Sequence, residues 1–246
     1  MKITFLGTSH GVPGEDRYCQ SMLIEENDAG YLIDAGAPVI DILIRRNYPL
    51  SKIKSVFITH VHGDHINGLI SLLDLANWYY KDMCLDVFLP ENRAIELIGE
   101  FLELSHNYKP LSERIKFRFY DEGEIYYDNN IKIEAFGTNH LTEYNKPTYG
   151  FVINSKDKKI CVSGDLHRTL TDFPKLSDKE PADLFIVECA HFEPDKLVEK
   201  LLCCNAKQFA PVHVYPLDKY DKLKELSDRH HINMVFPNDG GEYEIN

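Results

Sequence analysis

Four side chains that can bind metal ions lie within six positions of one another: His60, His62, Asp64 and His65. Imidazole nitrogens suit zinc and similar transition metals, and a carboxylate helps to bind a second, harder ion. The cluster follows the apolar run 55–58 and precedes the helix-like run 66–70. We therefore expect the end of a strand and the start of a helix to hold these side chains on a short turn, which Gly63 allows to fold tightly. The alternative is a polar loop whose histidines contact only water.

Three more side chains of the same types follow strand-like runs later in the chain: His140, Asp165 and His213. An acid at the end of an apolar strand, such as Asp165, is costly unless it is paired or bound to a metal. A single histidine is ordinarily a surface or core residue. The order of His140 and His213 behind the first cluster favours one shared metal site.

These side chains need strand ends to position them, and the sequence supplies many short strands. Apolar or alternating runs rich in β-branched and aromatic residues predict strands at 2–6, 21–25, 31–34, 55–59, 86–89, 115–120, 131–136, 149–154, 160–163, 184–188, 208–212 and 234–236. Helical patterns lie at 39–46, 66–80, 93–104, 194–202 and 219–230, and the polar stretch 121–130 suits a loop or hairpin. This order favours an α/β fold of two mixed sheets packed face to face with helices outside, an α/β/β/α sandwich, over a doubly wound parallel sheet. We expect a single domain over residues 1–246.

Composition restricts the partners of the chain. The sequence lacks the roughly 18–20 consecutive apolar residues that span a bilayer, and its start has no signal-peptide pattern, so we expect a cytoplasmic protein without a membrane partner. The formal net charge of −12 disfavours binding of long nucleic acids, which normally requires a basic face. Six scattered cysteines without a C-x-x-C pair indicate reduced thiols.

The H-x-H-x-D-H pattern at residues 60–65 resembles the signature of the metallo-β-lactamase superfamily. Further segments resemble the other motifs of that superfamily, in order along the chain: residues 32–36, 138–140, 163–165, 212–214 and 237–240, the last of them similar to the closing strand. The resemblance implies the metallo-β-lactamase fold and two divalent metal ions, with zinc favoured over manganese or iron.

The resemblance also implies a ligand for each position. His60, His62 and His140 would hold one ion, Asp64, His65 and His213 would hold the other, and Asp165 would bridge them. Asp34 is expected to orient the histidine loop and not to bind metal. The alternative for Asp34 is a turn-forming aspartate before glycine.

Several features indicate which branch of the superfamily the chain resembles. Zinc β-lactamases place a cysteine where this chain has Asp165, so β-lactam hydrolysis is not expected. Residues 5–13 and 140–150 look most like the ribonuclease Z and small phosphodiesterase branch. Short ribonuclease Z enzymes insert a long tRNA-gripping arm between these ligand motifs, whereas His140 and Asp165 are only 25 positions apart. We therefore expect a small phosphodiester or related ester as substrate, with a homodimer possible.

The expected reaction is hydrolysis by a metal-bridging hydroxide, with Asp64, Asp165 and His191 as catalytic residues. His191 is the favoured proton donor to the leaving group because it follows the predicted strand 184–188. His167 and His10 are the alternatives. A thioester or lactone hydrolase could use the same metals, and a non-catalytic metal-binding or redox module is a third possibility. The diiron redox branch usually has a glutamate in the first cluster and a flavin domain, which argues against that last one.

Overall fold

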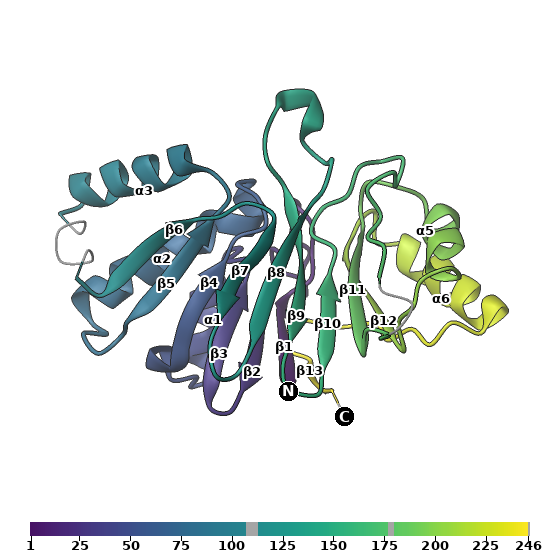
Figure 1. Ribbon diagram of the computed structural model, residues 1–246, viewed down its shortest axis with the longest axis horizontal. Helices are drawn as coiled ribbons and strands as arrows, with labels where there is room; N and C mark the ends of the chain where they lie inside the picture. Colours follow the sequence, from purple (N-terminus) through teal and green to yellow (C-terminus); the bar gives the residue numbers. More distant parts are fainter. Residues whose placement is uncertain (107–112, 177–179, 246) are drawn as a thin grey trace.

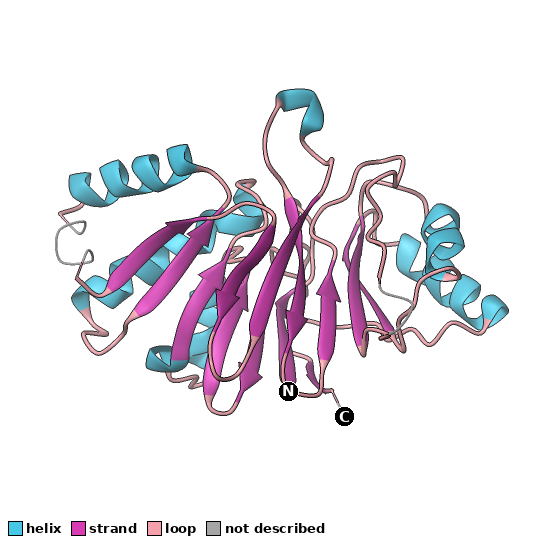
Figure 2. Ribbon diagram, in the orientation of Figure 1, coloured by secondary structure: helices cyan, strands magenta, loops and turns pink. Residues whose placement is uncertain are grey.

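The computed structural model describes residues 1–106, 113–176 and 180–245. Within them, two mixed β-sheets pack against each other and helices cover their outer faces (Figure 1, Figure 2). This arrangement confirms the predicted α/β/β/α sandwich of the metallo-β-lactamase fold.

The first sheet combines an antiparallel and a parallel half. Its strand order is β13 (Glu242–Glu244), β1 (Lys2–Gly7), β2 (Ser21–Glu26), β3 (Ala29–Ile33), β4 (Ile53–Phe57), β5 (Leu85–Leu89) and β6 (Ile115–Phe119). Pairing is antiparallel from β13 to β3 and parallel from β3 to β6. A short 3-10 helix, η1 (Leu50–Lys52), leads into β4.

The second sheet is also mixed. Its order is β12 (Phe209–Val214), β11 (Leu184–Cys189), β10 (Lys159–Val162), β9 (Tyr149–Asn154), β8 (Lys132–Gly137) and β7 (Gly123–Tyr127). Pairing is antiparallel from β7 to β10 and parallel from β10 to β12. The 3-10 helix η2 (Thr142–Tyr144) lies in the connection from β8 to β9. Every residue of β11 and β12 is buried, which explains their nearly continuous apolar sequences.

Three separate apolar clusters hold the four layers together. The first lies between the first sheet and α1 (Val39–Arg45), α2 (Gly63–Trp78) and α3 (Asn92–Leu104). The second consists of strand and loop residues from the facing sides of the two sheets. The third lies between the second sheet and α5 (Pro194–Leu201) and α6 (Lys219–His230). Central strands such as β5 and β10 contribute alternate residues to two apolar layers.

The structure differs from the sequence-based boundaries at three places. Helix α2 begins at Gly63, three residues before the expected start, so Asp64 and His65 lie in its first turn. The stretch 121–130, expected to be a loop or hairpin, does contribute β7 to a hairpin with β8. Residues 234–236 make one isolated bridge, Phe209 to Met234, and the closing strand is β13, beyond residues 237–240. Pro237 has no amide hydrogen for a sheet, which fits a loop at this point.

Across the described ranges of the chain, no helix has the length and apolar character needed to cross a membrane.

Candidate metal centre

The side chains of the first cluster come from the junction of β4 and α2. His60 and His62 lie in the loop after β4, and Asp64 and His65 lie in the first turn of α2. His60 and His65 are fully or almost fully buried, whereas His62 is exposed at the edge of the cluster. A strand end followed at once by a helix start thus presents four possible ligands within one turn.

The second sheet supplies the other side chains from the ends of its strands. His140 follows β8, Asp165 follows β10, His191 follows β11 and His213 lies near the end of β12. Gly164 has φ +60° just before Asp165, and a Cβ atom there would lie 2.2 Å from the Tyr149 carbonyl oxygen. Only glycine therefore fits the turn that directs Asp165 toward the cluster.

His213 itself has a positive φ of 51°, an unusual conformation for a non-glycine residue. Its amide donates a hydrogen bond to the Thr8 carbonyl oxygen at 2.7 Å, from the loop after β1. This contact from the first sheet helps to hold the His213 backbone in its strained conformation.

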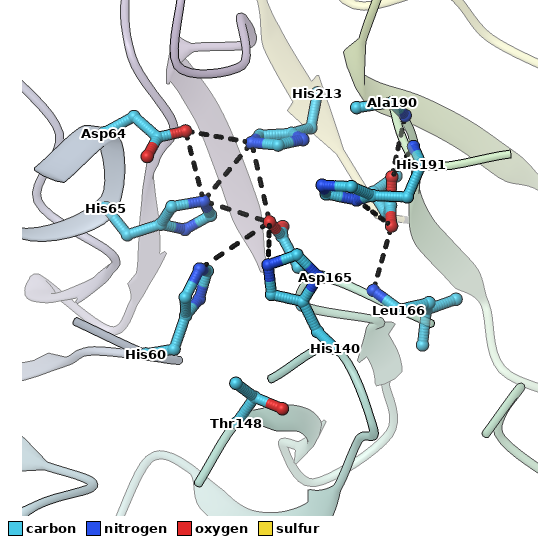
Figure 3. Close-up of polar contacts among 12 residues, drawn as sticks. His60, Asp64, His65, His140, Thr148, Asp165, Leu166, Ala190, His191 and His213 are labelled. Atoms are coloured by element: carbon cyan, nitrogen blue, oxygen red, sulfur yellow. Dashed lines mark hydrogen bonds and ion pairs between the residues drawn. The ribbon is translucent and has the colours of Figure 1, made fainter. Parts of the chain in front are cut away.

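Asp165 lies at the centre of the cluster (Figure 3). Its Oδ2 atom is 3.6 Å from His60 Nε2, 3.7 Å from His140 Nε2 and 3.8 Å from His213 Nε2. Its Oδ1 atom is 3.6 Å from His65 Nε2. The carboxylate therefore faces ring nitrogens from both sheets.

The candidate ligand atoms form groups whose members all lie within 4.8 Å of one another. One group contains His60, His62, His140 and Asp165, and another contains Asp64, His65 and His213. A third group contains Asp165, His191 and His213, which overlaps the others. The first two groups bring together the side chains that the superfamily resemblance assigns to the two ions, with Asp165 in the first of these groups only.

The chemistry of these atoms fits bound cations. His60 Nε2 and His140 Nε2 are buried and have no hydrogen-bond partner among the described residues. Buried polar atoms of this kind are rare, and a metal ion is one way to satisfy them. His65 Nε2 and His213 Nε2 face each other at 3.3 Å, with Asp64 Oδ2 3.1 Å from the latter.

Asp34 supports this arrangement from behind. Its carboxylate is 1% exposed, accepts a hydrogen bond from His65 Nδ1 at 2.7 Å and accepts another from the Thr59 amide at 2.8 Å. The His65 contact leaves Nε2 as the ring atom that faces the cluster.

The pKa values of His60 and His65 are shifted in opposite directions. Burial lowers the pKa of His60 well below its usual value, with a further contribution from His65, so its ring is neutral and can bind a metal. Burial also opposes protonation of His65, but the nearby carboxylates of Asp165, Asp34 and Asp64 raise its pKa to about 10. Three carboxylates around one ring mark a place where positive charge is favoured.

The pKa values of two carboxyl groups in the cluster, those of Asp165 and Asp64, are lowered. Burial by itself would raise the pKa of Asp165, but His213, His65 and His60 hold it well below the usual range. Burial likewise opposes ionisation of Asp64, yet its hydrogen bond with His213 and the charge of His65 bring its pKa to about 2. Both groups are therefore carboxylates at neutral pH.

The three histidines considered as proton donors lie in different surroundings. The His191 ring is 4.4 Å from the His140 ring and 5.8 Å from the His213 ring. His10 stacks on Tyr215 at 4.0 Å, with its ring 5.7 Å from that of His213. The Nδ1 atom of His167 pairs with Thr169 Oγ1 at 2.7 Å, outside the cluster.

Glu188 is a site residue that the sequence reasoning missed. Its side chain is 2% exposed, and its Oε1 atom accepts a hydrogen bond from His191 Nδ1 at 2.8 Å. Burial opposes protonation of His191, but this bond and the charge of Glu188 raise the His191 pKa to about 9. The signal was present in the sequence, because Glu188 is an acid near the end of an apolar strand, like Asp165.

The two mixed sheets with helices outside, and the cluster of histidines and aspartates at their strand ends, define a protein of the metallo-β-lactamase fold. Residues 1–198 match the family model described as "Anti-Pycsar protein Apyc1", and the chain belongs to that family.

Curated relatives with related sequences carry the name ribonuclease Z. That of Listeria innocua serovar 6a is 33% identical over 168 residues, covering 67% of this chain and 53% of the relative. That of Microcystis aeruginosa is 30% identical, covering 64% of this chain and 48% of the relative. The chain thus spans about half the length of these relatives.

Solved structures share the fold at lower sequence identity. Human tRNase Z, short form, matches with a TM-score of 0.76 at 21% identity and covers 100% of both chains. The metallo-β-lactamase fold protein YhfI from Bacillus subtilis matches with a TM-score of 0.76 at 20% identity, covering 98% of both. A diphosphatase from the PhnP family matches with a TM-score of 0.71 at 15% identity. The match covers 100% of this chain and 98% of the diphosphatase chain.

Proposed function

We propose that this protein is a binuclear metal-dependent hydrolase of small phosphodiesters. The observation that carries the proposal is the position of Asp165, whose carboxylate faces ring nitrogens of both ligand groups at 3.6–3.8 Å. Relatives named ribonuclease and diphosphatase support chemistry at phosphorus.

Each metal would have its own protein ligands. His60, His62 and His140 would hold one ion, Asp64, His65 and His213 the other, and Asp165 would be shared. Histidine nitrogens favour zinc, and the carboxylates also allow manganese or iron. Bound divalent ions supply a nucleophilic hydroxide at neutral pH and stabilise the negative charge of the transition state.

The leaving alkoxide needs a proton, and His191 is placed to donate it. Its ring reaches Asp165 and His213 closely enough to belong to one group with them, and Figure 3 shows the ring directed toward Asp165. Because Nδ1 donates to Glu188, the proton for the leaving group is carried on Nε2. The raised pKa keeps His191 protonated near neutral pH.

Two features favour a small substrate over folded RNA. Between His140 and Asp165, β9 and β10 belong to the second sheet and the other residues form short connections, so these 25 positions contain no long inserted arm. Binding to a long polyanion is driven largely by basic side chains that neutralise phosphates and release counterions. The net charge of −12 disfavours such binding.

The decisive experiment couples metal analysis to a substrate screen. Protein reconstituted with zinc or manganese should hold close to two equivalents per chain and hydrolyse bis-p-nitrophenyl phosphate or cyclic nucleotides. Full activity with one equivalent would contradict the binuclear site. Rapid turnover of lactones or thioesters without any phosphodiesterase activity would support the alternative ester hydrolase. Tight, salt-sensitive binding and cleavage of tRNA would overturn the small-substrate proposal.

A further inference from the structure

The turn that carries His191 is held by its amide groups on one side. This turn runs from Cys189, the last residue of β11, to Phe192. The Ala190 and His191 amides donate to Glu188 Oε2 at 2.7 and 3.3 Å. The Leu166 amide donates to Glu188 Oε1 at 2.9 Å, which links the turn to the segment just after Asp165.

Lys219 holds the same turn by its carbonyl oxygens. The Nζ atom donates to the carbonyl oxygens of Phe192 at 2.7 Å, Ala190 at 3.1 Å and Cys189 at 3.4 Å. A lysine ammonium has three protons and no acceptor, so these three bonds use all of its donors. Glu188 therefore binds amide groups of the turn, and Lys219 binds its carbonyl oxygens.

The burial of Lys219 shows that these bonds matter to the fold. Its side chain is only 9% exposed, and a buried ammonium is unfavourable unless its hydrogen bonds are made. The Glu193 carboxylate lies 3.9 Å away but is 72% exposed, so it is a weak counterion. The three carbonyl oxygens are the main compensation for the buried charge.

Local sequence preference does not explain a lysine at this position. Lys219 is the first residue of α6, where the helix dipole is positive and a cation is disfavoured. The contacts with the turn are tertiary, since the turn and α6 are separated by α5 and β12. A residue that violates a local rule and makes three bonds to a functional turn points to a role in the site.

We propose that Lys219 is a positioning residue that fixes the His191 turn, and this rests on the proposed role of His191 as proton donor. Loss of the ammonium would free three carbonyl oxygens and let the turn move, so His191 would spend less time aligned with the leaving group. The proposed metal ligands lie on other segments, and their contacts do not involve Lys219. Proton donation should weaken while metal binding persists.

The test compares Lys219→Met with Lys219→Arg, His191→Ala and the control Lys224→Met, an exposed lysine on the same helix. The measured quantity is the kcat/KM for an alkyl phosphodiester divided by that for bis-p-nitrophenyl phosphate, whose leaving group needs little protonation. We expect Lys219→Met to lower this ratio by roughly 10-fold or more, in the same direction as His191→Ala. Lys219→Arg keeps charged donors and should recover most of the ratio, and Lys224→Met should match the unmodified protein.

A second readout requires no metal and no substrate. In metal-free Lys219→Met, hydrogen–deuterium exchange should become faster in residues 190–192. Exchange in the residues of α6 after position 219 should not change. Metal content after reconstitution should stay unchanged. If Lys219→Met does not fold, Lys219→Gln, which retains an amide donor without charge, is measured in the same way.

The outcomes separate the two proposals. A normal ratio and normal exchange in Lys219→Met, with a lowered ratio in His191→Ala, would overturn the positioning role and leave the proposed function intact. Equal losses on both substrates, lost metal or faster exchange throughout α6 would show that Lys219 only stabilises the fold, which also overturns the inference. An unchanged ratio in His191→Ala would overturn both the donor assignment and the inference.

Discussion

At the scale of single residues, Asp165 is a buried carboxylate among histidine rings. A fully buried carboxylate between four histidine rings is unfavourable without positive charge, and these rings or bound cations supply it. The site therefore depends on Asp165, and this side chain does not belong to the apolar core.

Asp165→Ala should abolish phosphodiester turnover and weaken binding at both metal positions together, because it removes the shared ligand. The fold should persist, since the removed carboxylate packs against histidines and not in an apolar layer. Elemental analysis, initial rates and circular dichroism measure the three effects. Asp157→Ala, at an exposed turn, is the control. Wild-type rate and metal content in Asp165→Ala would show that the bridging role is wrong.

His191→Ala should cost about 10²–10⁴-fold on an alkyl phosphodiester and far less on a nitrophenyl ester, because only the poor leaving group needs a proton in the transition state. Steady-state kinetics on both substrates measure the effect, and metal content should not change. His10→Ala and His167→Ala should leave the ratio of the two rates nearly unchanged. Loss of metal in His191→Ala would instead indicate that His191 is a metal ligand. This role is the alternative because His191 forms one group of candidate ligands with Asp165 and His213.

At the scale of elements, the approach of α2 to the loop after β3 sets the place of Asp64 and His65. The Gly68 amide donates to the Ala35 carbonyl oxygen at 2.7 Å, and the Ala35 amide donates to the His65 carbonyl oxygen at 2.7 Å. The start of the helix is therefore tied directly to the segment that contains Asp34. Any side chain at Gly68 would have to separate them.

Gly68→Ala should destabilise the protein by about 1–3 kcal/mol even though alanine is the better helix former. A Cβ atom at this position would lie 2.6 Å from Val39 Cγ1 and 2.7 Å from the Ala35 carbonyl oxygen. Urea unfolding measures the loss, and metal affinity should fall with it as His65 shifts. Ser71→Ala, exposed on the same helix, should be neutral or slightly stabilising. Unchanged or increased stability of Gly68→Ala would contradict this account of the helix contact.

At the scale of the whole molecule, the two sheets are joined by polar contacts as well as by the apolar layer between them. Asp128, just after β7 of the second sheet, accepts hydrogen bonds from Tyr31 of the first sheet at 2.6 Å and from Tyr126 at 2.9 Å. Burial opposes ionisation of Asp128, but these bonds and those from the Ile131 and Asn130 amides leave its pKa below the usual 3.8. The folded protein therefore favours the charged form.

Asp128→Asn should lower the free energy of unfolding at pH 7 by about 1 kcal/mol, the usual value of a lost charge-assisted contact that is partly open to solvent. Because the folded pKa is depressed, the stabilisation by Asp128 is complete above pH 3.8 and is lost as pH falls through the lower folded value. The urea unfolding midpoints of Asp128→Asn and of the unmodified protein should therefore become equal at acidic pH. Asp157→Asn, at an exposed turn, should have the urea midpoint of the unmodified protein at pH 7. A difference in midpoint that stays constant with pH for Asp128→Asn would contradict the ionic role of Asp128.

The sequence by itself determined the local parts of this protein. Four possible ligands within six residues share one turn whatever the distant packing, because the chain between them is too short to separate them. Residue periodicity likewise predicted most of the strands and helices of the sandwich, since burial on one or both faces imposes its own pattern, but it missed β7 and β13. The assignment of metal ligands and of the proton donor remains a prediction, although the structure brings these side chains together.

Only the tertiary structure decided what joins distant segments. His213 reaches Asp64 across 149 positions, and Lys219 reaches the His191 turn from a helix start where local preference disfavours a cation. The buried contacts of Glu188 and the early start of α2 belong to the same class. Such contacts depend on the register of strands and on how two sheets pack, and these are set by the sum of many weak apolar contacts across the whole chain. No short pattern of residues records that sum, which is why the contacts between Lys219 and the His191 turn appear only in the folded molecule.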